Sequence, residues 1–380
     1  MTPARVVLAW LALGVLLGWL AWLYRRLAVA PGYGRRARWA ALAFVVVGAV
    51  GYGAANVVYR YLDPAPVRSL VWLGLAWLAV AWYLTLGLAV LGLAGLVLRL
   101  ARRPAAQARL LRVGTAVVLV AALGLTAYGA VAATRPQITD IEVVDPEVPP
   151  GWDGARIALI TDLHVGPVHG EEWTRRVVDL VDEQDPDLVL LGGDLVDGRE
   201  KYTRETLAPL ADLDPPLGVF AVTGNHEFET GDAAAYLADY ERLGIQVLRN
   251  QQVVLERDGD PLVLAGVHDR TGTGDGEPDP DAALAGVTPE AYCLLLVHQP
   301  RQLEDVDDPA VVDLQLSGHT HGGQLWPTEL LVRAEQPTVA GLDVVDGVQV
   351  VTGRGIGTSG TPVRVGSPPE VVVVTLDRDP

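Results

Sequence analysis

Acidic, amide and imidazole side chains recur at the ends of short apolar segments in the second half of this chain of 380 residues. The residues of metal-ligand type, in chain order, are Asp162, His164, Asp194, Asn225, His226, Glu227, His298, His319 and His321. Two divalent cations about 3.5–4 Å apart need a shared carboxylate together with further nitrogen and oxygen ligands around each ion. Imidazole and carboxylate ligands without thiolates are typical of Mn, Fe or Zn in catalytic sites. The residue types therefore predict a site for two divalent metal ions.

The spacing of these residues gives a first expectation about local geometry. Asp162 and His164 are two residues apart, as are His319 and His321. On an extended segment, residues two apart point to the same side, so both members of each pair are expected to bind one ion. A glycine precedes Asp194, and others precede Asn225 and His319, which would let the backbone turn sharply beneath the metals.

The segments before these residues read as strands of an α/β domain with mixed sheets. Apolar runs rich in Val, Ile and Leu predict strands at 156–161, 187–191, 218–223, 261–267, 292–297 and 312–316. Residues 171–184 have the periodicity of an amphipathic helix. Residues 246–266 predict a hairpin turning at 258–260, and 271–280 a flexible surface loop.

Five residues near the candidate ligands have secondary or open interpretations. Glu227 is expected to support the ligands rather than react, and neither His169 nor His268 is expected to bind metal. Asp269 either orients a ligand histidine or begins a surface loop. Trp326 either lines a substrate cleft or packs in the core.

The first third of the chain has a different composition from the rest. Residues 1–136 carry fourteen arginines and one acid, a balance of +13, whereas residues 137–380 carry a balance of −30. This asymmetry predicts a membrane domain at 1–136 and a catalytic domain at 137–380. The acidic surface of the second domain disfavours nucleic acid as a partner, because binding to phosphates needs basic groups.

Four segments of the first domain contain no charged residue. They cover 6–24, 39–59, 69–98 and 113–134, and each approaches or exceeds the roughly 20 residues that a helix needs to cross a bilayer. The sequence therefore predicts a multi-pass protein of the cell membrane with the lipid bilayer as a partner.

The arginines also predict the orientation. The loops after the first and third segments carry ten arginines, whereas the opposite side carries Arg5, Arg60, Arg68 and Arg135. Positively charged loops tend to stay in the cytoplasm. The catalytic domain is therefore expected on the extracytoplasmic side.

The ordered motifs resemble those of the calcineurin-like metallophosphoesterase superfamily. They are Asp-x-His at 162–164, Gly-Asp at 193–194, Gly-Asn-His-Glu at 224–227, the lone His298 and Gly-His-x-His at 318–321. The tail at 353–360 and 368–370, with the apolar N-terminal segments, is similar to a bacterial membrane-associated branch. Relatives of that kind are described as transmembrane proteins with a metallophosphoesterase domain. The resemblance implies a four-layer α/β/β/α sandwich with metals at the strand ends.

The resemblance also implies a role for each matched residue. Asp162, His164 and His321 would hold one metal, whereas Asn225, His298 and His319 would hold the other. Asp194 would bridge the two metals. His226 would face the phosphate as the catalytic residue, with a structural hydrogen-bond role as the alternative.

The function that follows from this resemblance is hydrolysis of a phosphate ester by a hydroxide held between two metals. A phosphodiesterase or phosphatase acting on a lipid-linked or cell-envelope substrate is the leading hypothesis. A membrane-held nuclease of the same fold and a non-catalytic metal-binding scaffold or sensor are the alternatives.

Overall fold

The computed structural model describes residues 3–379 and places them in two compact units. Unit 1 contains the described residues up to 56 together with Ser69–Tyr128. Unit 2 contains Val57–Arg68 and the described residues from 129 onward. The sequence predicted one boundary after residue 136, where the charge of the chain changes. The compact units divide the chain differently, because unit 2 also contains residues 57–68 and 129–136.

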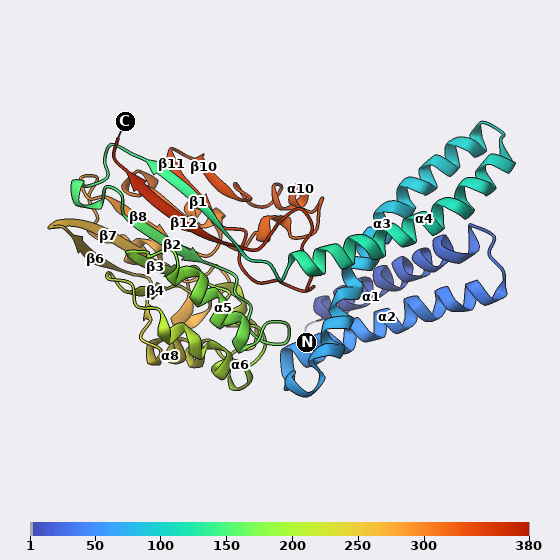
Figure 1. Ribbon diagram of the computed structural model, residues 1–380, viewed down its shortest axis with the longest axis horizontal. Helices are drawn as coiled ribbons and strands as arrows, with labels where there is room; N and C mark the ends of the chain where they lie inside the picture. The colour runs from blue at the N-terminus through green and yellow to red at the C-terminus, as the bar shows by residue number, and fades with distance from the viewer. Residues whose placement is uncertain (1–2, 380) are drawn as a thin grey trace. The chain divides into compact units, whose positions relative to one another are not determined.

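Four long apolar helices cover the segments predicted to span a membrane (Figure 1). They are α1 (Pro3–Tyr24), α2 (Arg35–Tyr61), α3 (Arg68–Leu100) and α4 (Pro104–Ala132). A π-helical turn, Arg25–Val29, continues α1. Each helix is long and apolar enough to cross a bilayer. The four predicted segments are therefore helical, and each is a candidate membrane span by its length and composition.

Small residues let α2 and α3 approach closely within unit 1. A side chain added at Gly74 would come within 2.5 Å of the Gly51 carbonyl oxygen. Trp19 of α1 donates a hydrogen bond of 3.0 Å to the Thr85 hydroxyl of α3. Backbone proximity at glycine and interhelical hydrogen bonds are the usual means of helix association where lipid surrounds the helices.

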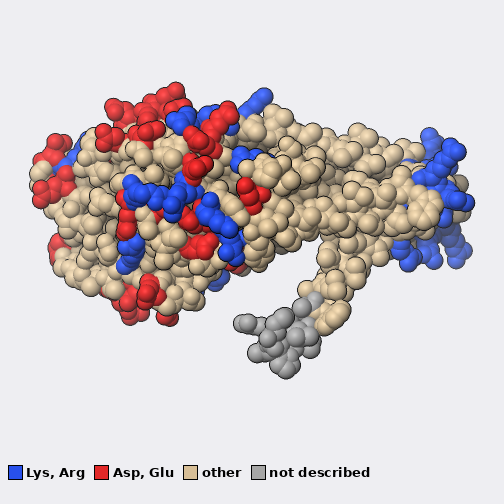
Figure 2. Space-filling model, turned by 90° about the horizontal axis from the view of Figure 1, so that it is seen from below, with Lys and Arg blue, Asp and Glu red and all other residues tan. Residues whose placement is uncertain are grey.

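The two arginine-rich loops of unit 1 lie at the same end of its helices. The Tyr33 hydroxyl, in the loop before α2, donates to the Arg112 carbonyl of α4 at 2.6 Å. Figure 2 shows arginine side chains gathered at that end, beyond a length of helices without charge. This distribution is the one expected of a membrane unit with its basic loops on one side.

The first sheet of unit 2 supplies four of the seven candidate ligands. Its strand order is β1-β12-β2-β3-β4-β5, and β2 to β5 run parallel. The strands are β1 (Gln137–Val144), β2 (Arg156–Ile160), β3 (Leu188–Leu191), β4 (Val219–Ala221), β5 (Gln246–Val247) and β12 (Glu370–Asp377). β12 runs antiparallel to β2 and pairs in parallel with β1.

The second sheet has the order β10-β11-β9-β8-β7-β6, in which β7, β8, β9 and β11 are parallel. Its strands are β6 (Gln251–Arg257), β7 (Asp260–Gly266), β8 (Cys293–Leu296), β9 (Leu314–Ser317), β10 (Gly341–Val345) and β11 (Val348–Thr352). β6 and β10 lie at the edges and pair antiparallel with β7 and β11.

Alternating side chains build three apolar layers around the two sheets. Ile157 and Leu159 point between the sheets, where they meet Leu294 and Leu316 in one core. Ala158 and its alternating neighbours face α5 (Glu171–Asp182), α6 (Glu200–Leu207) and α8 (Ala233–Arg242), which cover the first sheet (Figure 1). The short α9 (Pro280–Ala283) and 3-10 turns cover the second sheet. The predicted four-layer sandwich is confirmed.

Several local predictions need correction. The hairpin consists of β6 and β7 alone, because residues 246–247 pair with β4 in the other sheet. Its turn places Asp258 and Gly259 at φ values of 53° and 90°, the left-handed pair that suits a tight hairpin. The predicted loop at 271–280 contains a 3-10 turn at Gly274–Gly276.

Candidate metal centre

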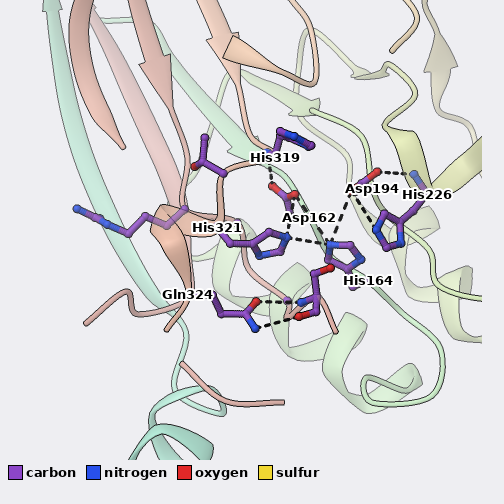
Figure 3. Close-up of polar contacts among 12 residues, drawn as sticks. Asp162, His164, Asp194, His226, His319, His321 and Gln324 are labelled. Carbon is purple, nitrogen blue, oxygen red and sulfur yellow. Dashed lines mark hydrogen bonds and ion pairs between the residues drawn. The ribbon is translucent and has the colours of Figure 1, made fainter. Parts of the chain in front are cut away.

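The candidate ligands all follow strands at the carboxyl ends of the two parallel sheets. Asp162 follows β2, Asp194 follows β3, and Asn225 begins the short helix α7 (Asn225–Glu229) after β4. From the second sheet, His298 follows β8, and His319 follows β9. Because the ligand-bearing strands of each sheet run in parallel, these loops meet at one edge of the sandwich (Figure 3).

One group of ligand atoms contains Asp162, His164 and His321, which are all buried. His321 Nε2 lies 3.3 Å from Asp162 Oδ1 and 3.1 Å from His164 Nε2. Metal–ligand bonds of about 2.0–2.2 Å put neighbouring ligand atoms at roughly such separations. The group can therefore hold one metal ion.

A second group contains Asp194, His298 and His319. His298 Nε2 lies 3.3 Å from Asp194 Oδ2 and 3.2 Å from His319 Nδ1. Asp194 Oδ2 also lies 3.9 Å from His164 Nε2 in the first group. Asp194 is thus the carboxylate placed between the two groups.

Two buried oxygen atoms provide a further test of whether cations fit here. Asn225 Oδ1 and Asp162 Oδ1 have no hydrogen-bond donor among the residues that the structure describes. Leaving such atoms without a partner in a buried site costs about 1–3 kcal/mol each. Two divalent cations would satisfy these oxygens, one each, so the donor set fits metal binding.

The backbone of the site differs from the extended geometry expected of Asp-x-His. Asp162 has φ 54° and His164 has φ 48°, in the left-handed region that side chains other than glycine rarely occupy. His319 and His321 have φ values of 69° and 49°, and they point into different groups. The expectation that each pair would share one side by strand alternation was wrong for His319 and His321. Asp162 and His164 do share a group, but through tight turns.

Glycines also bring the loops of the first sheet together. Gly193 has φ 85°, and a side chain there would lie 2.5 Å from the Gly224 backbone nitrogen. A side chain at Gly224 would collide with Asp194 Oδ1. The predicted sharp turn is therefore present at Gly193, whereas Gly224 is required by close packing.

Asp197 joins a candidate ligand to His226, and the sequence analysis missed it. Its Oδ1 atom lies 2.9 Å from His164 Nδ1 and 2.7 Å from His226 Nδ1. A carboxylate that accepts from both Nδ1–H groups leaves each Nε2 atom available. The available sequence signal was its position three residues after Asp194.

The position of His226 permits two roles. Its Nε2 atom lies 3.8 Å from Asp194 Oδ2, so His226 forms a possible three-residue group with His164 and Asp194. Its side chain is also slightly exposed, unlike that of His164. The exposed edge lets His226 meet a substrate beside the two groups.

Burial and charge act in opposite directions on these groups. Burial alone would raise the pKa of Asp194, but the imidazoles of His298 and His226 hold it well below its usual range. Burial opposes protonation of His226, yet Asp194 and Asp197 outweigh it and raise the pKa of His226 to about 10. Both shifts have one cause: carboxylates and imidazoles lie close together in a buried site, where each favours the charged form of the other.

Glu227 supports the loops, as expected from the sequence. Its buried carboxylate accepts hydrogen bonds from the backbone nitrogens of Gly224 at 2.6 Å, Asp194 at 3.1 Å and Leu195 at 2.9 Å. The Tyr240 hydroxyl of α8 donates to it at 3.0 Å. Glu227 thereby fixes the loops that carry Asp194 and Asn225.

Arg364 supports the other side of the site and was also missed. It is buried, and its guanidinium donates to the carbonyl oxygens of Gly357 at 2.8 Å, Arg354 at 2.9 Å and Gly355 at 3.0 Å. Its Nη2 atom lies 3.1 Å from His321 Nδ1. The C-terminal tail is thereby held against His321. Gln324 adds hydrogen bonds to the same tail (Figure 3).

The structure also places the residues near the ligands whose roles the sequence left open or secondary. Asp269 is buried and accepts from Gln299 Nε2 at 2.7 Å, so it supports the residue next to His298 instead of a ligand histidine. Trp326 is 59% exposed, which excludes core packing. His169 contacts Thr358, and His268 contacts Thr223, both outside the two groups.

Replacing Asp197 with asparagine tests its supporting role. We expect about 10- to 100-fold weaker metal binding and a lower kcat, because His164 and His226 would lose the acceptor that orients them. Metal titration of the stripped full-length variant measures the first effect. Asp179→Asn on the exposed face of α5 is the control, and unchanged metal affinity in Asp197→Asn would contradict this role.

Comparison with known proteins agrees with this geometry. Residues 155–323 match the family Calcineurin-like phosphoesterase. An Uncharacterized metallophosphoesterase of Aquifex aeolicus is 36% identical over 238 residues, which cover 61% of this chain and 89% of the relative. The chain belongs to the calcineurin-like metallophosphoesterase family, whose members are metal-dependent phosphoric ester hydrolases.

Its relatives include proteins named for a membrane region. The Transmembrane protein with metallophosphoesterase domain of Danio rerio is 34% identical over 275 residues, covering 70% of this chain and 63% of the relative. The Bos taurus protein of the same name is 35% identical over 265 residues, covering 66% and 59%. The chain thus spans about three-fifths of the length of these two relatives. Their names and the four apolar helices support a location in a membrane.

Proposed function

We propose that this protein is a membrane-anchored phosphoesterase whose catalytic centre holds two divalent metal ions. The main support is the convergence of two ligand groups on Asp194, which lies between them. Asp162, His164 and His321 would hold one ion, whereas His298 and His319 would hold the other with Asn225. The imidazole and oxygen donors suit Mn, Fe or Zn.

The metals and the chain would divide the chemistry. Bound divalent cations would lower the pKa of a water molecule and neutralise charge on the phosphate oxygens. His226 is held by Asp197 at its Nδ1 atom, so its Nε2 side can meet the phosphate and hold a proton for the departing oxygen. Asp197 and Glu227 keep the loops in position, which limits reorganisation during the reaction.

We propose that all four helices cross the bilayer and that unit 2 faces the extracytoplasmic side. The ten arginines at one end of unit 1 support this orientation. Residues 57–68, which link α2 to α3, belong to unit 2, where Arg60 pairs with Glu229 at 3.2 Å. If both α3 and α4 cross the bilayer, this link lies on the same side as the residues that follow α4. A substrate in the lipid or the cell envelope suits this placement.

The test is a metal and substrate screen on the purified full-length protein in lipid nanodiscs. We expect a chelator to abolish hydrolysis of bis(4-nitrophenyl) phosphate or 4-nitrophenyl phosphate. Manganese, iron or zinc should restore activity at about two ions per chain. Hydrolysis that survives complete metal removal would refute the proposal.

The same screen separates the alternative functions. Single-stranded and double-stranded DNA serve as additional substrates, and the charge of −30 on residues 137–380 predicts poor hydrolysis of both. A strong preference for DNA would instead support the nuclease. No hydrolysis with any metal and substrate, despite stoichiometric metal binding, would support the scaffold or sensor.

A further inference from the structure

An open cleft of ≈ 570 Å³ lies beside the second ligand group of unit 2. Asn225 and His319 form part of its wall, so the cleft reaches the candidate metal centre. A phosphate at that centre would leave the non-reacting part of its ester in this space. The other residues of the wall therefore meet the part of the substrate that distinguishes one ester from another.

Two arginines enter the wall from different loops of the second sheet. Arg270 follows β7, and Arg301 follows β8 three residues after His298. Residues 137–380 contain only fifteen basic residues against forty-five acids. Two guanidinium groups beside a metal centre are therefore a local departure from an acidic surface.

The backbone on each side of Arg270 is held by buried groups. Asp269 accepts hydrogen bonds from Thr271 N at 2.8 Å and Gln299 Nε2 at 2.7 Å. The Asp269 backbone nitrogen donates to the Thr223 hydroxyl at 3.1 Å. These contacts fix the origin of the Arg270 side chain, which reduces the entropy lost when it binds a ligand.

Arg301 is anchored in a similar way. Its backbone nitrogen donates to the buried Gln336 Oε1 at 3.1 Å. Its Nε atom is buried and has no acceptor among the residues that the structure describes. Its Nη2 atom lies 3.7 Å from Glu304 Oε2, beyond hydrogen-bond distance. The side chain is about one-third exposed, so its outer guanidinium nitrogens retain donors that an anion could use.

The acids near these arginines leave room for an anion to compete. Asp305 lies 3.1 Å from Arg270 Nε, but both side chains are about one-third exposed, so solvent weakens this ion pair and little free energy is lost when an anion replaces it. Glu229 and Glu335 also line the cleft. Glu229 has a partner of its own in Arg60 at 3.2 Å, and Glu335 is exposed to water.

We propose that Arg270 and Arg301 bind a second anionic group on the substrate, such as another phosphate or a carboxylate. This inference rests on the proposed function, which it narrows to phosphate esters with an additional negative charge on the non-reacting part. Guanidinium groups suit this role, since their paired N–H donors match phosphate and carboxylate oxygens.

A matched pair of diesters tests the proposal on the full-length, metal-loaded protein. One is the 4-nitrophenyl ester of thymidine 5′-phosphate, and the other carries an additional 3′-phosphate. We expect the additional phosphate to lower KM by about tenfold or more in the unchanged protein. In Arg270→Ala/Arg301→Ala the two KM values should become equal, whereas the exposed control Arg333→Ala should keep the difference.

The outcomes separate this inference from the proposed function. Equal KM values in the unchanged protein, or a difference that survives in the double variant, would overturn the second-anion site while hydrolysis itself persists. If hydrolysis of these esters is too slow to measure, calorimetry with thymidine 5′-phosphate and thymidine 3′,5′-bisphosphate decides the question. Tighter binding of the bisphosphate, lost only in the double variant, supports the site, and equal binding overturns it.

Discussion

Replacing Asp194 with asparagine should lower kcat by about 10³-fold or more, since it removes the one carboxylate that lies between both ligand groups. Charge stabilisation by a metal pair contributes several kcal/mol, and about 4 kcal/mol corresponds to that factor. Asparagine keeps the size and one oxygen but loses the negative charge. The loss should therefore affect metal binding and hydrolysis together.

The measurement combines steady-state hydrolysis with metal analysis of the same purified sample. We expect fewer than two ions per chain in Asp194→Asn. Asp179→Asn makes the same chemical change at an exposed position and should keep full activity. Retained hydrolysis with two bound ions in Asp194→Asn would show that the two groups do not work as one centre.

His226→Gln should lower kcat by about 10²- to 10⁴-fold while leaving two bound ions in place. His226 Nδ1 is held at 2.7 Å from Asp197, so its Nε2 atom keeps one orientation toward the site. Glutamine can occupy a similar volume, yet it cannot transfer a proton at neutral pH. The effect should fall mainly on kcat, with a small change in KM.

Metal content makes this variant decisive, because the geometry also allows His226 to join His164 and Asp194 as a ligand. Loss of one ion together with the activity would assign His226 to metal binding. Unchanged kcat would leave it the structural hydrogen-bond role. The control is His169→Gln, since His169 stacks on Trp173 outside both ligand groups.

The parts of the fold that the sequence predicted are those with local signals. β2, β3, β7 and β8 are short apolar runs followed by Asp, His or Gly, and almost all of their residues are buried. The sheet edges had weaker signals. Half of the residues of β1 are exposed, and its partner β12 lies more than 200 residues away, so their pairing was not visible locally.

The candidate site also combines features that local sequence signals predicted with features that depend on contacts between distant elements. The residues that converge at the strand ends could be predicted from their types and order, but their backbone conformation could not. Left-handed φ values at Asp162 and His164 arise from contacts between loops, such as the Asp162 nitrogen bonded to the Gly193 carbonyl at 3.0 Å. Asp197 and Arg364 escaped prediction because their partners lie on other elements.

Cys293 offers a practical route to the membrane sidedness of unit 2. It is the only cysteine, it lies fully buried in β8, and burial with Asp313 nearby raises its pKa to about 12. A thiol so enclosed and so weakly ionised reacts poorly with maleimides. A cysteine introduced at exposed Asp281 or Arg103 would thus be the sole reactive thiol, and an impermeant maleimide on intact cells would report which position is outside.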